Sequence, residues 1–274
     1  MIKANTFYIL HLGSIYIGLV HKTTLDRFAS KTPISKVSVL MAAYNEEITF
    51  EKAVRDLLKV LTSLPCSHEL IIVESNSTDN TRYLATKLQA ELGYRLILQQ
   101  QALGKGFAIR EALLQKTGDV FLIYDADGEY NPEDLPNLLS PIASGATSFV
   151  LGTRHQDGFA MREMSDYKAK SIIMNYAHKF FTFLINLFFG TKLTDPFTMF
   201  KIFRSEVFDD VELVSNRFDL DWELVAKAIR RGSHPIEVPV LYVSRSFSEG
   251  KKIRFFYDPI TWIVALIRFR FGKL

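Results

Sequence analysis

Two carboxylates, Asp125 and Asp127, stand one residue apart directly after the β-branched and aromatic run 119–124. Such a run predicts a buried strand, and open α/β sheets bind their ligands at the carboxyl ends of strands. Mg²⁺ and Mn²⁺ prefer oxygen ligands and commonly bridge protein carboxylates to substrate phosphates. The pair therefore predicts a Mg²⁺ or Mn²⁺ site that holds a diphosphate. The alternative is a solvated turn, because Asp and Gly are ordinary turn residues.

The composition restricts the class of protein. The chain has 274 residues, of which 48% are hydrophobic and 23% charged, and this is enough for a full α/β core in one domain with appendages. The formal net charge of +3 is too small to indicate binding of nucleic acid. Cys66 is the single cysteine, which excludes an intramolecular disulfide and a cysteine-based metal cluster.

Strand and helix patterns alternate along residues 37–151. Strands are expected at 37–43, 69–73, 94–99, 119–124 and 148–151, and helices at 50–61, 80–92, 105–115 and from Asn131 onward. This alternation predicts an α/β fold with a mostly parallel sheet and helices on both faces. A dinucleotide-binding fold is excluded, because residues 42–47 after the first strand contain no glycine.

Several segments resemble one enzyme family in order and spacing. The segments are 43–47, 73–81, 103–106, 125–127, 150–154 and 195–201. They resemble the family-2 inverting glycosyltransferases of GT-A fold. Residues 236–240 and 245–253 are similar to the tail of the dolichyl-phosphate mannose synthase and polyprenyl-phosphate sugar transferase branch. The resemblance covers roughly residues 36 to 256 and implies the GT-A fold.

The resemblance implies a site for a nucleotide-diphosphate sugar. Ala43, Tyr44 and Glu46 would flank the nucleotide base. Glu74 stands where the family usually has an aspartate that accepts from a base N–H, so the donor stays open between UDP-linked and GDP-linked sugars. Asp79 would support the nucleoside pocket or cap the following helix.

The resemblance also implies the groups around the diphosphate. Asp125, Ala126 and Asp127 would lie at the sugar nucleotide, with Glu129 as a third metal ligand. Lys105 and Arg154 would donate to the leaving diphosphate. The glycines beside Lys105 either open a helix or let backbone amides approach a phosphate.

Two classes of acceptor remain open. A sugar hydroxyl needs a general base, for which Asp219, Asp221 and Glu223 are candidates, although they also suit a charged first helical turn. A polyprenyl (dolichyl or undecaprenyl) phosphate needs no base, because it is already largely ionised.

For the lipid phosphate, the expected contacts are Arg154, Arg245 and Lys251. A third reading is a catalytically degenerate sugar-nucleotide-binding protein, favoured by Ser75-Asn76 in place of the family's Asp-Gly.

Two apolar stretches predict contact with a membrane surface. Residues 172–189 suit an interfacial helix better than a span, because polar residues interrupt them. Residues 259–271 follow a basic segment, and Trp262, Leu266 and Phe269 are expected to enter the lipid. The alternative is that both stretches are core helices.

The chain is thus expected to have three parts. Residues 1–35 form an apolar amino-terminal extension and linker, 36–246 the GT-A glycosyltransferase domain, and 247–274 a basic amphipathic tail. The predicted enzyme is peripheral or membrane-associated and acts at the cytoplasmic face of a membrane.

Overall fold

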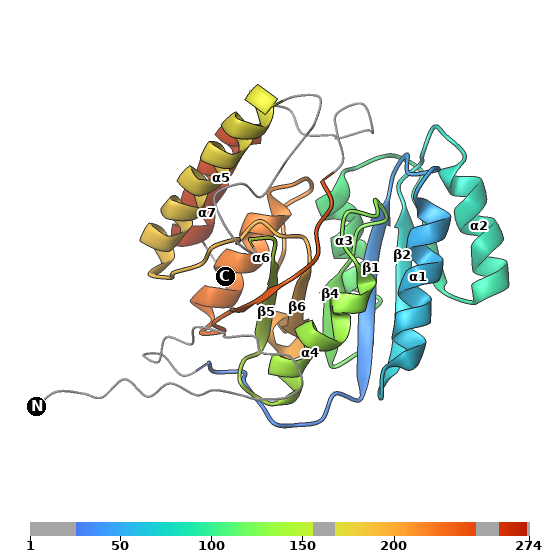
Figure 1. Cartoon of the computed structure of the whole chain (residues 1–274), viewed down its shortest axis with the longest axis horizontal. Helices are drawn as coiled ribbons and strands as arrows, with labels where there is room; N and C mark the ends of the chain where they lie inside the picture. The colour runs from blue at the N-terminus through green and yellow to red at the C-terminus, as the bar shows by residue number, and fades with distance from the viewer. Residues whose placement is uncertain (1–25, 156–167, 245–257, 273–274) are drawn as a thin grey trace, which may run out of the picture.

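The computed structural model describes residues 26–155, 168–244 and 258–272. Its centre is a seven-stranded sheet with the order β3-β2-β1-β4-β6-β5-β7 (Figure 1). The strands are β1 Lys36–Ala43, β2 Ser67–Glu74, β3 Arg95–Leu98, β4 Val120–Ile123, β5 Phe149–Thr153, β6 Lys201–Arg204 and β7 Ile236–Pro239. All neighbouring pairs are parallel except the two that involve β6.

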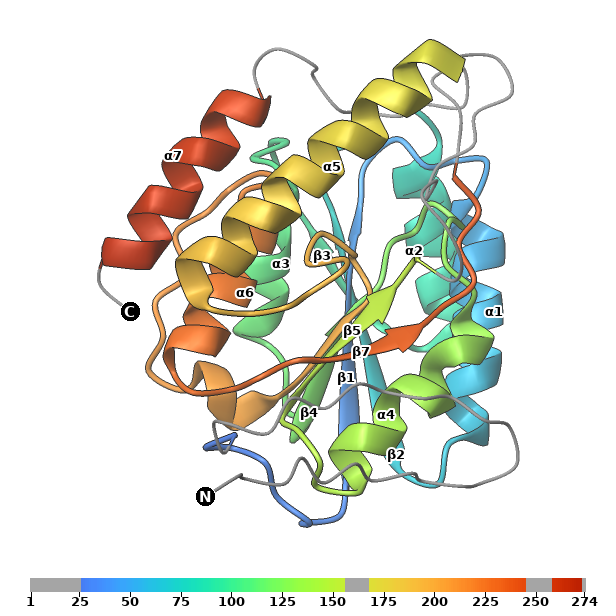
Figure 2. The same ribbon diagram turned by 60° about the vertical axis from the view of Figure 1, so that its left-hand side comes forward.

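Helices cover both faces of this sheet, as the alternating pattern predicts. They are α1 Phe50–Ser63, α2 Thr81–Leu92, α3 Lys105–Leu113, α4 Leu135–Ala143, α5 Lys168–Phe189, α6 Leu220–Arg230 and α7 Asp258–Phe271. One apolar cluster joins the sheet to α1, α2 and α4, and a second joins it to α3, α5, α6 and α7 (Figures 1 and 2). The prediction of an α/β fold with helices on both faces is confirmed.

Strands β6 and β7 are the elements that the strand and helix pattern does not predict. The four residues of β6 are all buried between β4 and β5, and β6 runs antiparallel to both. Strand β7 also has four residues and pairs in parallel with β5 at the edge of the sheet. A run this short carries no readable alternation. The carboxyl ends of β1, β2 and β4 still lie together, because β1 pairs with both of its neighbours in parallel.

The described part of the expected linker, residues 26–35, is attached to the domain. The Asp26 carboxylate accepts hydrogen bonds from the Ser148 backbone N–H at 2.8 Å and from the Thr147 hydroxyl at 3.0 Å. The Arg204 guanidinium donates to the carbonyl oxygens of Ser30 and Thr32. These contacts fix the segment across the amino end of β5, away from the carboxyl ends of the parallel strands.

Helix α7 packs against the protein through residues that the sequence suggests would enter lipid. Leu266 and Phe269 are each only 2% exposed and belong to the core cluster beneath α5 and α6. The expectation that these two side chains insert into a membrane is therefore wrong. Among the side chains of α7 that the structure describes, the exposed apolar ones are Ile263, Val264, Ile267 and Phe271.

Helix α5 has a buried face and an exposed face, and both are apolar. Phe181 and Ile185 pack into the core, while the opposite face exposes Ile172, Ile173, Tyr176, Phe180, Phe183 and Leu187. Among the described helices, the window Ile172–Phe189 alone is long and apolar enough to cross a membrane, and one third of it is buried. Length and composition are weak evidence for a span, because core helices meet the same criterion.

Candidate active site

A cavity of about 740 Å³ opens at the carboxyl ends of β1 and β4. The predicted residues that line it are Tyr44, Glu46, Lys105, Asp125, Ala126, Asp127, Glu129, Arg154 and Asp221. Among the residues that the structure describes, five carboxylates and three lysine or arginine side chains line this cavity. Its walls are therefore acidic, which favours a cation over a bare diphosphate.

Asp125 forms an ion pair with Lys105 across the cavity. The Lys105 Nζ lies 2.6 Å from Oδ1 and 2.7 Å from Oδ2 of Asp125. Burial opposes the charge on Lys105, but Asp125, Asp221 and Asp127 outweigh it and raise the pKa of the ammonium. Lys105 therefore stays protonated and holds Asp125 in place from the first turn of α3.

The loop after β4 positions the other two predicted metal ligands. The Asp127 carboxylate accepts from the Glu129 backbone N–H at 3.0 Å across Gly128, whose φ of 72° suits glycine. The Glu129 carboxylate accepts from the Tyr242 hydroxyl at 2.7 Å. Within the described ranges no three His, Cys, Asp or Glu side chains come together as a metal site. Glu129 as a third ligand thus gains no support.

A two-carboxylate site nevertheless suits the predicted metal. Mg²⁺ is commonly held by one or two carboxylates together with substrate phosphates, rather than by a cage of protein ligands. Asp125 and Asp127 supply hard oxygen ligands at one wall of the cavity. These residues therefore fit a divalent cation that arrives with a diphosphate.

The residues predicted to surround the base divide into two groups. Tyr44 and Glu46 line the cavity. Ala43 and Glu74 are fully buried, and Glu74 accepts from the Ser77 backbone N–H at 2.6 Å and pairs with Arg82. In the structure Glu74 holds its own loop, and its carboxylate lies outside the cavity lining.

Asp79 lies directly before Asn80, the N-cap residue of α2. Its carboxylate accepts from the backbone N–H of Thr81 at 2.9 Å and of Glu47 at 3.2 Å. Burial would raise the pKa of Asp79, but these hydrogen bonds outweigh burial and lower it. Asp79 therefore supports the start of α2 from the position before the N-cap, and it lies outside the cavity lining.

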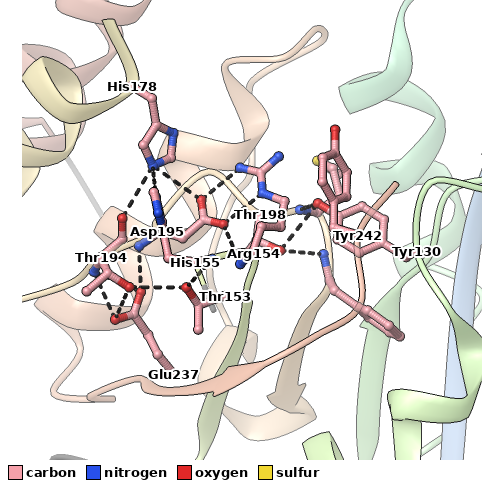
Figure 3. A network of polar contacts seen from close by, with 12 residues as sticks. Tyr130, Thr153, Arg154, His155, His178, Thr194, Asp195, Thr198, Glu237 and Tyr242 are labelled. Carbon is pink, nitrogen blue, oxygen red and sulfur yellow. Dashed lines mark hydrogen bonds and ion pairs between the residues drawn. The ribbon is translucent and has the colours of Figure 1, made fainter. Parts of the chain in front are cut away.

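Arg154 is held by a buried ion pair that the sequence does not reveal. Its Nε and Nη2 each lie 2.7 Å from one oxygen of Asp195, which is fully buried (Figure 3). Burial would raise the pKa of Asp195, but Arg154 outweighs it and holds this pKa well below its usual range. The guanidinium also lies over the Tyr242 ring, 5.1 Å from its centroid.

Two further polar residues, from β7 and from α5, contact the loop that carries Asp195. Glu237 of β7 accepts from the backbone N–H groups of Thr194 and Asp195, each at 2.7 to 2.9 Å (Figure 3). From α5, the His178 Nε2 lies 3.6 Å from the Asp195 Oδ1. Burial raises the pKa of Glu237. The sequence does not identify Glu237 or His178 as site residues, because nothing in a single sequence links them to Asp195.

The acidic cluster at the start of α6 separates into different roles. Asp221 lines the cavity and lies 3.0 Å from the buried Lys201 Nζ. Glu223 is fully buried, pairs with Lys227 at 2.8 Å and accepts from the Val214 and Ser215 backbone. The hypothesis that Glu223 acts as a base is therefore wrong, since it cannot reach a substrate. Arg245 and Lys251 lie outside the described residues.

The two glycines on either side of Lys105 allow another backbone segment to pack closely against them. A Cβ at Gly104 would lie 2.2 Å from the carbonyl oxygen of Asn216, and one at Gly106 would lie 2.7 Å from that of Ser215. The segment 215–217 therefore occupies the space beside the first turn of α3. This explains the Gly-Lys-Gly triplet without a phosphate contact by the glycines.

The comparisons with known proteins agree with this geometry. A model described as Glycosyl transferase family 2 matches residues 38–212, more than half of the chain. A dolichol-phosphate mannosyltransferase of Pyrococcus furiosus is 28% identical over 79% of this chain, which spans 59% of that protein. An undecaprenyl-phosphate 4-deoxy-4-formamido-L-arabinose transferase of Klebsiella pneumoniae is 25% identical over 88% of this chain and 76% of the relative.

A solved structure shows the same fold. Glucosyl-3-phosphoglycerate synthase of Mycobacterium tuberculosis, in complex with Mn²⁺, UDP and phosphoglyceric acid, matches with a TM-score of 0.64 and 18% identity, over 88% of this chain and 80% of that one. The family match and the shared fold agree with each other. The chain therefore belongs to glycosyl transferase family 2 and is a glycosyltransferase of GT-A fold.

Proposed function

We propose that this chain is a metal-dependent, inverting glycosyltransferase that moves one sugar from a UDP-linked or GDP-linked donor to a polyprenyl phosphate. The membrane-bound acceptor would be a dolichyl or undecaprenyl phosphate, reached from the cytoplasmic face. The relatives named for dolichol phosphate and undecaprenyl phosphate support the acceptor, and the neighbour crystallised with Mn²⁺ and UDP supports the metal and the donor.

The main support for this proposal is that the lining of the cavity has two chemically different parts. One part is the carboxylate wall at the strand ends, and the other is apolar. The apolar part is formed by Ile173, Met174, Ala177, Phe181, Phe197, Met199, Trp222 and Trp262 from α5, α6, α7 and a connecting loop. A phosphate on a hydrocarbon chain needs both surfaces, whereas a sugar acceptor would bury its hydroxyl groups against apolar side chains at a cost.

The polar residues have distinct tasks in this mechanism. Asp125 and Asp127 would hold a divalent cation, which would neutralise charge that develops on the leaving nucleoside diphosphate. Lys105 would add a donor at the same place. Nε and Nη2 of Arg154 donate hydrogen bonds to Asp195, so a hydrogen bond from Arg154 to a phosphate would come from Nη1. Attack by the acceptor oxygen from the opposite face of the sugar gives inversion.

The nature of the acceptor decides what Asp221 does, since Asp221 is the member of the acidic cluster that lines the cavity. A phosphate acceptor arrives ionised, so we expect Asp221→Asn to keep kcat within about tenfold of the wild type. Arg245→Ala and Lys251→Ala should instead raise the KM for polyprenyl phosphate, since each removes a cation. Steady-state kinetics of the three variants measure both effects.

The hydroxyl-acceptor alternative predicts the reverse pattern. A fall of several hundredfold in kcat for Asp221→Asn, with both basic variants near normal, would favour it. Asp221 also neutralises Lys201, so the unfolding midpoint of Asp221→Asn must be measured alongside. The double variant Asp221→Asn with Lys201→Met removes the buried ammonium and separates loss of the fold from loss of a base.

Membrane association would use the exposed apolar faces of α5 and α7, which lie side by side (Figure 2). Phe180 and Phe183 are 54% and 60% exposed. We expect Phe180→Gln with Phe183→Gln to weaken binding to anionic liposomes by at least about tenfold, because burial of apolar side chains drives such binding. Tyr83→Gln is the matched control, since Tyr83 is 66% exposed on α2 at the other end of the sheet. If the Phe180→Gln/Phe183→Gln variant and Tyr83→Gln lose co-sedimentation with liposomes equally, the membrane-binding surface does not lie on α5 and α7.

A further inference from the structure

Within the described part of the chain, three lysine or arginine side chains line the cavity, and two of them are already neutralised. Lys105 pairs with Asp125, and Arg154 pairs with Asp195 through two hydrogen bonds. The third is Arg217, which lies just before α6. The structure gives the guanidinium of Arg217 no carboxylate or carbonyl partner among the residues that it describes. The Asp219 carboxylate, two residues away, accepts instead from the Arg217 backbone N–H at 3.0 Å.

The backbone of Arg217 is fixed even though its guanidinium is exposed. The Asn216 carbonyl oxygen accepts from the Phe107 backbone N–H at 3.1 Å, and the Asn216 side chain accepts from Arg110 at 2.6 Å. Gly104 and Gly106 let this segment lie directly against the first turn of α3. Arg217 is therefore held at the cavity wall next to Lys105, with a cationic group on a flexible stem.

We propose that Arg217 binds a phosphoryl oxygen of the substrates of this cavity. The inference rests on the proposed function. A bidentate guanidinium suits a phosphate, and an arginine that forms no ion pair with any described residue has its charge available to a ligand. Both substrates carry phosphate: the donor has a diphosphate, and the acceptor has a monoester. The position beside Lys105 makes Arg217 a residue that determines affinity for one of these two groups.

Direct binding tests the proposal without any requirement for turnover. UDP and GDP in the presence of MnCl₂, and geranyl phosphate as a soluble analogue of the acceptor, are titrated by calorimetry into the wild type and Arg217→Gln. We expect the dissociation constant of either the nucleotide or geranyl phosphate to rise roughly ten- to a hundredfold, the loss of one hydrogen bond to a charged group. Arg217→Lys should recover part of the affinity, because lysine keeps the positive charge but cannot donate two parallel hydrogen bonds as a guanidinium does.

The outcomes of this experiment separate the two sources of phosphate. A loss confined to UDP or GDP assigns Arg217 to the donor, and a loss confined to geranyl phosphate assigns it to the acceptor. Lys59→Gln removes an exposed charge on α1, outside the cavity lining, and should change neither constant. If Arg217→Gln behaves like Lys59→Gln toward all three ligands, Arg217 does not bind phosphate and the proposal is overturned.

The proposed function can fail independently of Arg217. If the wild type binds nucleotide and Arg217→Gln weakens that binding, yet no sugar reaches a polyprenyl phosphate, the acceptor assignment falls and the Arg217 assignment stands. An unchanged unfolding midpoint is expected for Arg217→Gln, because the exposed guanidinium has no hydrogen-bond or ion-pair partner among the described residues. A lowered midpoint together with equal weakening of all ligands would show a structural role and overturn the proposal.

Discussion

Replacement of Asp127 by alanine is expected to reduce sugar transfer by on the order of a thousandfold while the protein stays folded. Asp127 lies at the cavity wall in the loop after β4, and its carboxylate accepts from the Glu129 backbone N–H. The metal that it would hold is worth several kcal/mol to the departure of the diphosphate, which corresponds to a loss of this size. Transfer assays and circular dichroism of the purified variant measure the two quantities.

A matched aspartate controls for the change of charge. Asp56 lies on α1 in an exposed pair with Lys52, outside the cavity lining, so Asp56→Ala should keep full activity. EDTA should reproduce the defect in the wild type, and added Mn²⁺ should reverse it. Full activity of Asp127→Ala, or of chelated wild type with a native spectrum, would contradict the metal assignment.

The largest expected effect on stability is at Asp195. Removal of one partner from a buried ion pair leaves the other charge uncompensated, so Asp195→Ala is expected to lower the free energy of unfolding by about 3–5 kcal/mol. The loss also frees the side chain of Arg154, whereas the hydrogen bond from the Asp195 backbone N–H to Glu237 is kept. Chemical denaturation measures the change. The double variant Arg154→Met with Asp195→Leu should recover much of the stability, because no unpaired charge remains.

The pH dependence of stability follows from the same pair. The folded-state pKa of Asp195 lies below its unfolded value of about 3.9, so the pair stabilises the protein fully above that value. The contribution is lost as the pH falls from about 4 toward the folded-state pKa. The difference in unfolding free energy between wild type and Asp195→Ala should therefore shrink in acid. A difference that is constant from pH 7 to pH 3 would contradict this account.

Most strands of the sheet can be predicted from the sequence, because each of them is a short run of apolar residues that is recognisable on its own. Strand β4 is an apolar run that ends just before Asp125, so the place of both carboxylates follows from the parallel order. Strand β6 is not predictable in this way. Its four residues carry no period, and its antiparallel place between β4 and β5 depends on pairings far along the chain.

The candidate site is less predictable than the fold, because burial and long-range pairing decide the roles of charged residues. Glu223 and Asp221 are two positions apart in one acidic cluster, yet one is buried against Lys227 and the other faces the cavity. Helix α7 poses a similar problem, since an apolar face can pack on protein or on lipid. Leu266 and Phe269 pack on protein. The partnership of Arg154 with Asp195 spans 41 positions and leaves no local trace.

The most direct test of the proposed reaction is the identity of the labelled product. Radiolabelled UDP-sugars and GDP-sugars are incubated with Mn²⁺ and a polyprenyl phosphate, or with the matching polyprenol that lacks the phosphate, and lipid is extracted with organic solvent. Asp127→Ala provides the blank. The account predicts label in the lipid fraction with the phosphate and none with the polyprenol. Label that appears only in a water-soluble glycan, or no transfer to any acceptor by protein that still binds nucleotide, would contradict it.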